Sequence, residues 1–144
     1  MQLLERDPAL DALGGWLAEP RAGRGRLVLV GGEAGVGKTT LVEAFAGRHR
    51  PVARVLVGAC DPLTTPRPLG PLADVAPAIG GRLDQLLREQ APREQLFPAL
   101  LERLVGARVA TVLVIEDAHW ADEATLDLLR YLARRWGRPR CWWW

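Results

Sequence analysis

The hydrophobic positions of this chain fall into two patterns. Apolar runs at residues 26–31, 52–58 and 109–115 are typical of buried parallel strands, and the third run is apolar on both faces, which predicts a central strand. Between and around these runs, apolar residues recur every three or four positions. This spacing predicts helices over residues 7–19, 40–50, 72–106 and 122–136. Strands that alternate with helices indicate an α/β fold, with a parallel sheet between helical layers.

Capping and turn-forming residues mark the ends of these elements. Asp7 is the expected N-cap of the first helix and Asp122 that of the last. The long third helical region is expected to break near Gly80–Gly81 and again at Pro92. Residues 60–71 contain four prolines, which predicts a pre-ordered loop without a regular element.

Composition narrows the class of protein only slightly. A length of 144 residues suits one domain, and a net charge of +2 is too small to indicate nucleic-acid binding. No apolar run reaches membrane-spanning length, and the acidic N-terminus is unlike a signal peptide. Cys60 and Cys141 lack metal-ligand or redox spacing, which favours two reduced thiols in a cytoplasmic protein.

The most specific local signal is Gly32-Glu33-Ala34-Gly35-Val36-Gly37-Lys38-Thr39, which has the spacing of a phosphate-binding P-loop. Lys38 is the sole lysine beside 18 arginines. A flexible point charge fits inside a closed phosphate loop, whereas a planar guanidinium fits poorly. The alternative, a plain glycine-rich turn, is disfavoured because the segment lies between a predicted strand and a predicted helix.

The P-loop residues have distinct expected roles. Its glycines allow backbone N–H groups to turn inward around phosphates, and the following helix aims its positive end at the anion. Lys38 is expected to reach the β- and γ-phosphates, and the Thr39 hydroxyl to bind Mg²⁺. The expected ATP-binding residues are Gly32, Glu33, Ala34, Gly35, Val36, Gly37, Lys38, Thr39 and Thr40.

Two acidic residues, Glu116 and Asp117, directly follow the third apolar run. Carboxylates at the end of a buried strand are costly unless they meet a cation, and parallel sheets bind ligands at that edge. With Lys38, the pair is therefore the candidate catalytic set, and with Thr39 it is the candidate Mg²⁺ site. Either Glu116 approaches the metal through water with Asp117 as the base, or Asp117 alone serves the metal. A solvated pair that caps the next helix is the alternative.

The acidic pair is closely followed by His119 and Trp120, whose side chains could also act in chemistry. His119 is interpreted as a structural hydrogen-bond partner, because a lone histidine here is more often structural than catalytic. Trp120 is interpreted as a packing residue.

With these residues in view, the chain resembles the AAA-type, ORC-like ATPase domain of STAND signalling ATPases, as in large LuxR-type and MalT-like bacterial transcription regulators. The resemblance is carried by residues 31–40, 61–72 and 114–122, while Glu5-Arg6-Asp7 is similar to a family segment near the adenine. It implies a three-layer P-loop NTPase sandwich that uses ATP and Mg²⁺ as a switch, with hydrolysis as the reset. It also implies self-association or contact with other regulator domains. The family's DNA-binding part is absent, so this segment is expected to bind no nucleic acid directly.

The chain ends on Arg140-Cys141-Trp142-Trp143-Trp144, where the resemblance implies a strand rich in leucine and valine with a polar sensor residue. One set of codons for these residues, read in a shifted frame, encodes Leu-Leu-Val-Val. We therefore expect a P-loop ATPase domain over residues 1–144 that is incomplete at the C-terminus, with strands missing or altered from about residue 138, in a fragment of a longer protein. A genuine short protein with an unusual tail is the alternative.

The sequence thus predicts an ATP- and Mg²⁺-binding domain that hydrolyses the β–γ bond of ATP and serves as the nucleotide switch of a signalling regulator. A nucleotide-binding or interaction fragment without turnover is one alternative. A P-loop kinase is another, although the sequence shows no acceptor-binding lid or base for it. Turnover without an added acceptor separates a hydrolase from a kinase.

Overall fold

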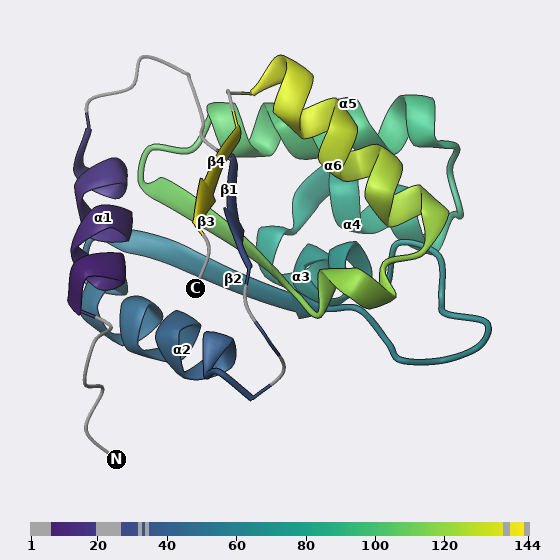
Figure 1. The fold of residues 1–144 in the computed structure, drawn as a ribbon. Coiled ribbons are helices and arrows are strands. Elements are labelled where there is room, and N and C mark those ends of the chain that lie inside the picture. The colour runs from purple at the N-terminus through teal and green to yellow at the C-terminus, as the bar shows by residue number, and fades with distance from the viewer. Residues whose placement is uncertain (1–6, 20–26, 32, 34, 137–138, 143–144) are drawn as a thin grey trace.

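Helices and strands alternate along the chain, as the hydrophobic pattern predicts (Figure 1). The computed structural model describes residues 7–19, 27–31, 33, 35–136 and 139–142. Its helical elements are α1 (Asp7–Ala18), α2 (Lys38–His49), α3 (Gly70–Ile79), α4 (Gly81–Arg88), α5 (Arg93–Val105), the 3₁₀ turn η1 (Ala118–Trp120) and α6 (Glu123–Arg135). Its strands are β1 (Leu27–Val30), β2 (Ala53–Ala59), β3 (Ala110–Glu116) and β4 (Pro139–Trp142).

The strands form two parallel pairs. β2 pairs with β3 from Ala53 opposite Ala110 to Ala59 opposite Glu116. β1 pairs with β4 over four residues. Among the described strands, β3 therefore has β2 as its one ladder partner, so it is not the central strand that its sequence predicts. β4 is short and begins with a proline, which has no N–H to give to a ladder.

The two faces of the β2–β3 pair contact different helices, which gives a layered α/β arrangement. Leu56 of β2 and Leu113 of β3 belong to a cluster with α3, α4, α5 and α6. Val112, the residue before Leu113, packs instead against a second cluster formed by α1 and α2. Because successive strand residues point to opposite faces, β3 contributes to both clusters. Figure 1 shows α1 and α2 on one side of these strands and α3 to α6 on the other.

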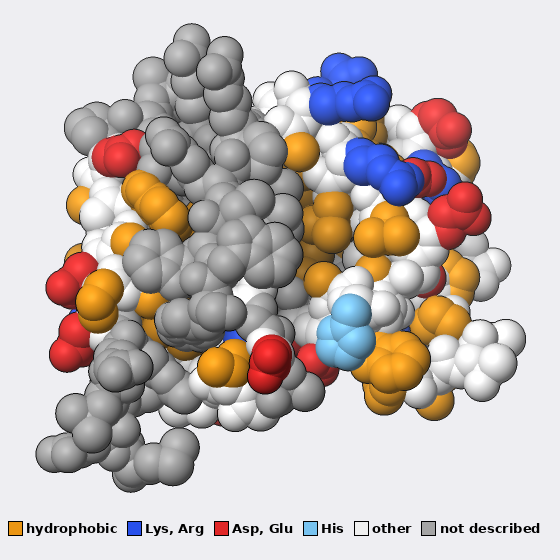
Figure 2. All heavy atoms as spheres, viewed as in Figure 1, with side chains coloured by type: hydrophobic (Ala, Val, Ile, Leu, Met, Phe, Trp, Pro, Cys, Tyr) orange, Lys and Arg blue, Asp and Glu red, His pale blue; other side chains and the backbone are white. Residues whose placement is uncertain are grey.

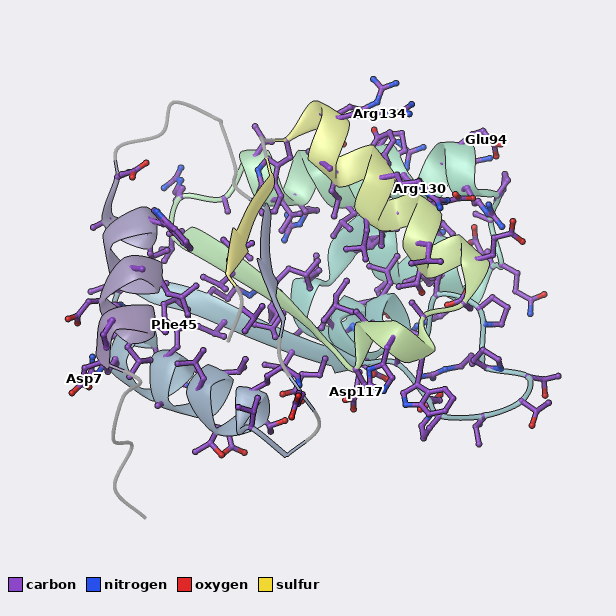
Figure 3. All side chains as sticks on the ribbon, viewed as in Figure 1. Asp7, Phe45, Glu94, Asp117, Arg130 and Arg134 are labelled. Carbon is purple, nitrogen blue, oxygen red and sulfur yellow. The ribbon has the colours of Figure 1, made fainter. Side chains whose placement is uncertain are left out.

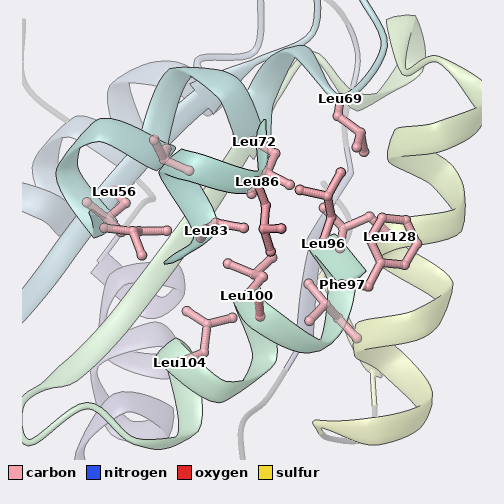
Figure 4. Packing of buried hydrophobic residues seen from close by; sticks show 14 of the residues in the cluster. Leu56, Leu69, Leu72, Leu83, Leu86, Leu96, Phe97, Leu100, Leu104 and Leu128 are labelled. Atoms are coloured by element: carbon pink, nitrogen blue, oxygen red, sulfur yellow. The ribbon is translucent and has the colours of Figure 1, made fainter. Parts of the chain in front are cut away.

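The larger cluster lies between α3, α4, α5 and α6 (Figure 4). Leu83 and Leu100 have no exposed surface, and Leu128 of α6 is 1% exposed. Leu83 and Leu100 come from apolar positions that recur every three or four residues in the predicted 72–106 helical region. The break of the predicted 72–106 region is confirmed, because Gly80 and Gly81 both have positive φ and residues 89–92 separate α4 from α5.

Helix α3 begins at Gly70, two residues before the predicted start, and so includes the last two residues of the predicted proline-rich loop. Pro71 lies in the first turn of α3, where a missing N–H costs little. Leu69 forms the N-cap with φ +53 and is buried. Asp122 is confirmed as the N-cap of α6, while Asp7 is the first residue of α1 and not its cap.

The expected site of a missing or altered strand carries β4 in the structure. β4 lies parallel to β1, with Val30 opposite Trp142. Figure 1 shows the two strands side by side. The flanking residues 137–138 and 143–144 lie outside the described part of the chain.

Charged side chains of α6 form ion pairs at the surface of the molecule. Asp127 pairs with Arg93 of α5 and with Arg130 one turn further along α6. Figure 2 shows Lys and Arg side chains over this region interspersed with acidic and apolar ones. Within the described ranges, no helix has the length and apolar character needed to cross a membrane.

Candidate nucleotide site

The predicted P-loop connects the end of β1 to the start of α2. Gly35 has φ +80 and Gly37 has φ +92, values that residues with a side chain rarely adopt. The Val36 N–H donates to the Glu33 carbonyl over 3.3 Å, which closes the turn. Gly32 and Ala34 lie outside the described residues.

The loop delivers the chain into a helix whose first turn can receive an anion. Gly37 is the N-cap of α2, and no side chain of the described residues caps that helix. The N–H groups of the first turn of a helix have no partner within the helix, so they can bind an anion such as phosphate.

Lys38 is the first residue of α2, and its Nζ donates to the Glu33 carbonyl over 2.9 Å. The amine therefore bends back across the loop toward the space that its glycines enclose. Thr39 is exposed, and Thr40 is half-buried behind it. Three features fit a polyphosphate chemically: glycines with positive φ, a helix end without a side-chain cap, and a cation over the loop.

The structure brings Thr39 and Glu116 to the same cavity, which has a volume of about 390 Å³. Its other lining residues come from one face of α2, together with Val57 of β2. Glu116 is the last residue of β3 and is half-buried. A hydroxyl and a carboxylate are the oxygen ligands that Mg²⁺ prefers, and Mg²⁺ keeps further positions for phosphates and water. The donor set therefore fits Mg²⁺, although no cluster of three His, Cys, Asp or Glu side chains suited to a metal occurs among the described residues.

Asp117 differs from Glu116 in both conformation and surroundings. It has φ +54, is exposed, and does not line the Thr39 cavity. Its carbonyl accepts the Trp120 N–H over 2.8 Å, so the chain turns sharply into η1 (Figure 3). The two adjacent acids therefore lie in different surroundings.

Residue 120 corrects one interpretation of the sequence. Trp120 is 47% exposed and so is not a buried packing residue. Its ring lies 5.3 Å from that of His119, which is also exposed. A 3₁₀ turn of three residues at the edge of the molecule offers no interior for a large ring, so the indole stays at the surface.

Carboxylates gather near the buried thiol of Cys60. The Cys60 N–H donates to the Glu116 carbonyl over 3.0 Å, which extends the ladder of β2 and β3 by one bond. Burial raises the pKa of the Cys60 thiol, and the nearby Asp122, Asp117, Asp61 and Asp74 raise it further. The thiol therefore stays protonated, and the end of the sheet is electronegative.

Two polar residues near this end of the sheet were not singled out from the sequence. Asp74 of α3 accepts the Ala59 N–H over 3.2 Å and pairs with Arg67 over 2.8 Å. These contacts fasten the proline-rich loop and α3 to the end of β2. Arg67 lies within the 61–72 segment that carries the resemblance and Asp74 lies just after it, and only the tertiary contacts distinguish these two residues.

Comparison with known proteins identifies the class to which this fold and site belong. The AAA ATPase domain family matches residues 2–143, so the chain belongs to that family and is a nucleotide-binding domain of the AAA type. It is 29% identical over 175 aligned positions to an uncharacterized protein of Rhizobium meliloti (strain 1021). That alignment covers 92% of this chain and 17% of the relative, so the chain spans about a sixth of the relative's length. No solved structure matches the chain with significant similarity.

Proposed function

We propose that this domain binds ATP with Mg²⁺ and hydrolyses the β–γ bond, acting as the nucleotide switch of a STAND-type signalling or transcription regulator in the cytoplasm. The observation that carries the proposal is that Thr39, at the start of α2, and Glu116, at the end of β3, line one cavity beside the P-loop turn. Membership of the AAA ATPase domain family supports nucleotide binding. The regulator role rests on the resemblance of residues 31–40, 61–72 and 114–122.

The residues of the P-loop and of the acidic pair have distinct tasks in this proposal. The loop N–H groups and Lys38 bind the phosphates and offset the charge that develops on the leaving oxygen. The Thr39 hydroxyl and Glu116 would hold Mg²⁺, which would neutralise part of the charge of the phosphates. Asp117 orients the water whose oxygen bonds to the γ-phosphorus as the bond from that phosphorus to the β–γ bridging oxygen breaks. The products are ADP and inorganic phosphate.

The shared cavity favours one of the two assignments of the acidic pair. Glu116 lies with Thr39, so Glu116 is the metal-side acid in this proposal, and the more exposed Asp117 serves the water. Direct nucleic-acid binding is not part of the proposal, because the net charge is only +2 and Arg93 and Arg130 are paired with Asp127. Self-association and contact with other regulator domains are proposed as the ways in which the switch acts.

Titration of the purified chain with fluorescent ATP and Mg²⁺ tests the proposal. We expect saturable binding in the wild type, weakened by more than about tenfold in Lys38→Ala because a charge-assisted contact to phosphate is lost. Arg48→Ala is the matched control, since Arg48 is a cation of the same helix that faces Asp7 and Asp11. Equal affinity in Lys38→Ala and the wild type would exclude the P-loop as the site.

Phosphate release without an added acceptor then separates the remaining functions. Release by the wild type supports hydrolysis. Saturable binding without release means a switch or interaction domain that does not turn over ATP. Release that requires an added acceptor means a kinase.

A further inference from the structure

The carboxylate of Asp122 joins the starts of two helices. It accepts the N–H groups of Ala124 and Thr125, at 3.0 Å and 3.3 Å, as the N-cap of α6. Its other oxygen accepts the Thr125 hydroxyl. It also faces the N–H of Leu69, at 3.4 Å, which is 53 residues earlier in the chain. One side chain therefore contacts the starts of both α6 and α3.

These contacts are sheltered from solvent. Thr125 is 1% exposed and Leu69 is 6% exposed. Leu69 also belongs to the larger hydrophobic cluster, as do Ala124 and Leu128 of α6. Hydrogen bonds in such surroundings are exposed to little competition from water, so the carboxylate holds a defined position.

Asp122 stands at the end of the short turn that begins with Asp117. The turn is closed by two hydrogen bonds, from the Trp120 N–H to the Asp117 carbonyl at 2.8 Å and from the Ala121 N–H to the Ala118 carbonyl at 3.1 Å. Asp117 has φ +54, a left-handed conformation that non-glycine residues rarely adopt. Such a turn persists when both of its ends are held.

The two ends of this turn are held by different groups. At the β3 end, the Glu116 carbonyl accepts the Cys60 N–H over 3.0 Å. At the α6 end, the Asp122 carboxylate makes the contacts described above. Because Asp117 lies between these two anchors, loss of the Asp122 anchor would free Asp117 to move relative to Glu116.

We propose that Asp122 is a positioning residue of the nucleotide site, which holds the turn that carries Asp117 in place beside Glu116. This role rests on the proposed function, since it acts through the acidic pair. A helix cap alone would affect the stability of the protein. A positioning residue also affects the acidic pair: Glu116, the proposed metal-side acid, directly precedes the turn that Asp122 anchors, so loss of the anchor should also lower the gain in ATP affinity that Mg²⁺ provides.

The test compares the dissociation constant of ATP in EDTA with that in Mg²⁺, and the ratio of the two is the Mg²⁺ gain. In Asp122→Ala we expect the Mg²⁺ gain to fall by about tenfold, as when a residue that orients a metal site is removed. Affinity in EDTA should stay within about twofold of the wild type, because Lys38 and the loop N–H groups are untouched. Where the wild type turns over ATP, kcat should fall more than KM changes.

Two further variants serve as a rescue and a control. Asp122→Asn should restore most of the Mg²⁺ gain, because its amide oxygen still accepts backbone N–H groups. Asp127→Ala should leave the Mg²⁺ gain unchanged, since Asp127 is on the same helix and pairs with Arg93 and Arg130. If Asp122→Ala does not fold, Thr125→Val replaces it and should lower the Mg²⁺ gain by about threefold, through loss of one hydrogen bond.

The outcomes separate the positioning role from the proposed function. An unchanged Mg²⁺ gain in a folded Asp122→Ala, or in Thr125→Val where that variant replaces it, would overturn the positioning role alone. Equal weakening of ATP in EDTA and in Mg²⁺ would overturn it as well, because that is the effect of a purely structural cap. A wild-type chain that does not bind ATP, or binds it without any Mg²⁺ gain, contradicts the proposed function and removes the positioning role with it.

Discussion

At the scale of single residues, Cys60 shows how the end of the sheet alters side-chain chemistry. The thiol is 4% exposed and lies close to the carboxylates of Asp61, Asp74, Asp117 and Asp122. Removing water from a thiolate and placing it beside negative charges both disfavour ionisation. The residue is a free cysteine, as the sequence predicts, but an unreactive one.

The raised pKa of Cys60 makes part of the stability pH-dependent. Above the ordinary value of 9.0, the unfolded chain loses the thiol proton while the folded chain retains it. The unfolded state then binds fewer protons, so stability falls as pH rises through this range, by up to about 1.4 kcal/mol per pH unit. Urea unfolding of the wild type near neutral pH and near pH 10 measures this loss.

Cys60→Ala is the control for that measurement, because every other titratable group of the chain is present in both proteins. The stability difference between wild type and Cys60→Ala should change in favour of the variant as pH rises. A difference that is constant between neutral pH and about pH 10 would contradict a raised thiol pKa in the folded state.

At the scale of elements, the close approach of β2 and α3 sets the position of the proline-rich loop. A Cβ on Gly58 would lie 2.3 Å from the Pro71 carbonyl oxygen and 2.8 Å from the Pro71 Cα. These atoms belong to the backbone and cannot rotate away. Gly58 therefore allows the first turn of α3 to lie directly on β2, where Asp74 reaches the Ala59 N–H.

Gly58→Ala should separate these elements and destabilise the protein by about 1–3 kcal/mol, the usual cost of overpacking a buried site. Denaturant unfolding measures the change. Gly15→Ala is the matched control: Gly15 is an exposed glycine within α1, and a Cβ there meets nothing within 4 Å. That variant should stabilise the protein by about 0.5–1 kcal/mol, because alanine is the better helix former. Gly58→Ala with wild-type stability would show that α3 does not rest on β2 in solution.

At the scale of the whole molecule, the two hydrophobic clusters share β3. Leu113 contacts the cluster of α3 to α6, whereas Val112 contacts the cluster of α1 and α2. The P-loop leads into α2, and Glu116 ends β3, so the proposed nucleotide site draws residues from α2 and from the strand that both clusters share. A ligand at that site should therefore stabilise the molecule as one unit.

ATP with Mg²⁺ should raise the melting temperature in a single transition. At about 100 times the dissociation constant, a ligand adds about 2.7 kcal/mol to the free energy of unfolding. For a domain of this size, that is a rise of roughly 5–10 °C. Differential scanning fluorimetry of the wild type and Lys38→Ala, with and without ATP and Mg²⁺, measures it. No shift is expected in Lys38→Ala, and two transitions of which one responds to ATP would contradict coupling through β3.

The local parts of this protein could be predicted from its sequence. The strand–loop–helix order around the P-loop, the breaks near Gly80–Gly81 and Pro92, and the cap at Asp122 each depend on neighbouring residues. Glycine dihedrals, proline's missing N–H and a carboxylate beside a helix end act within a few positions of the chain. For that reason a linear pattern was sufficient to predict them.

The relations between distant segments were decided by the tertiary structure. Thr39 shares a cavity with Glu116, carboxylates gather around Cys60, and Asp122 reaches Leu69 across 53 residues. Each of these relations depends on how strands pair and helices pack. The strand pairing itself departs from the apolar pattern of β3, which predicts a neighbour on both sides, whereas β2 is its one ladder partner among the described strands. Burial and hydrogen bonding across the sheet are properties of the packed chain. Apolar spacing shows that a residue is buried, but the fold determines which residues it meets.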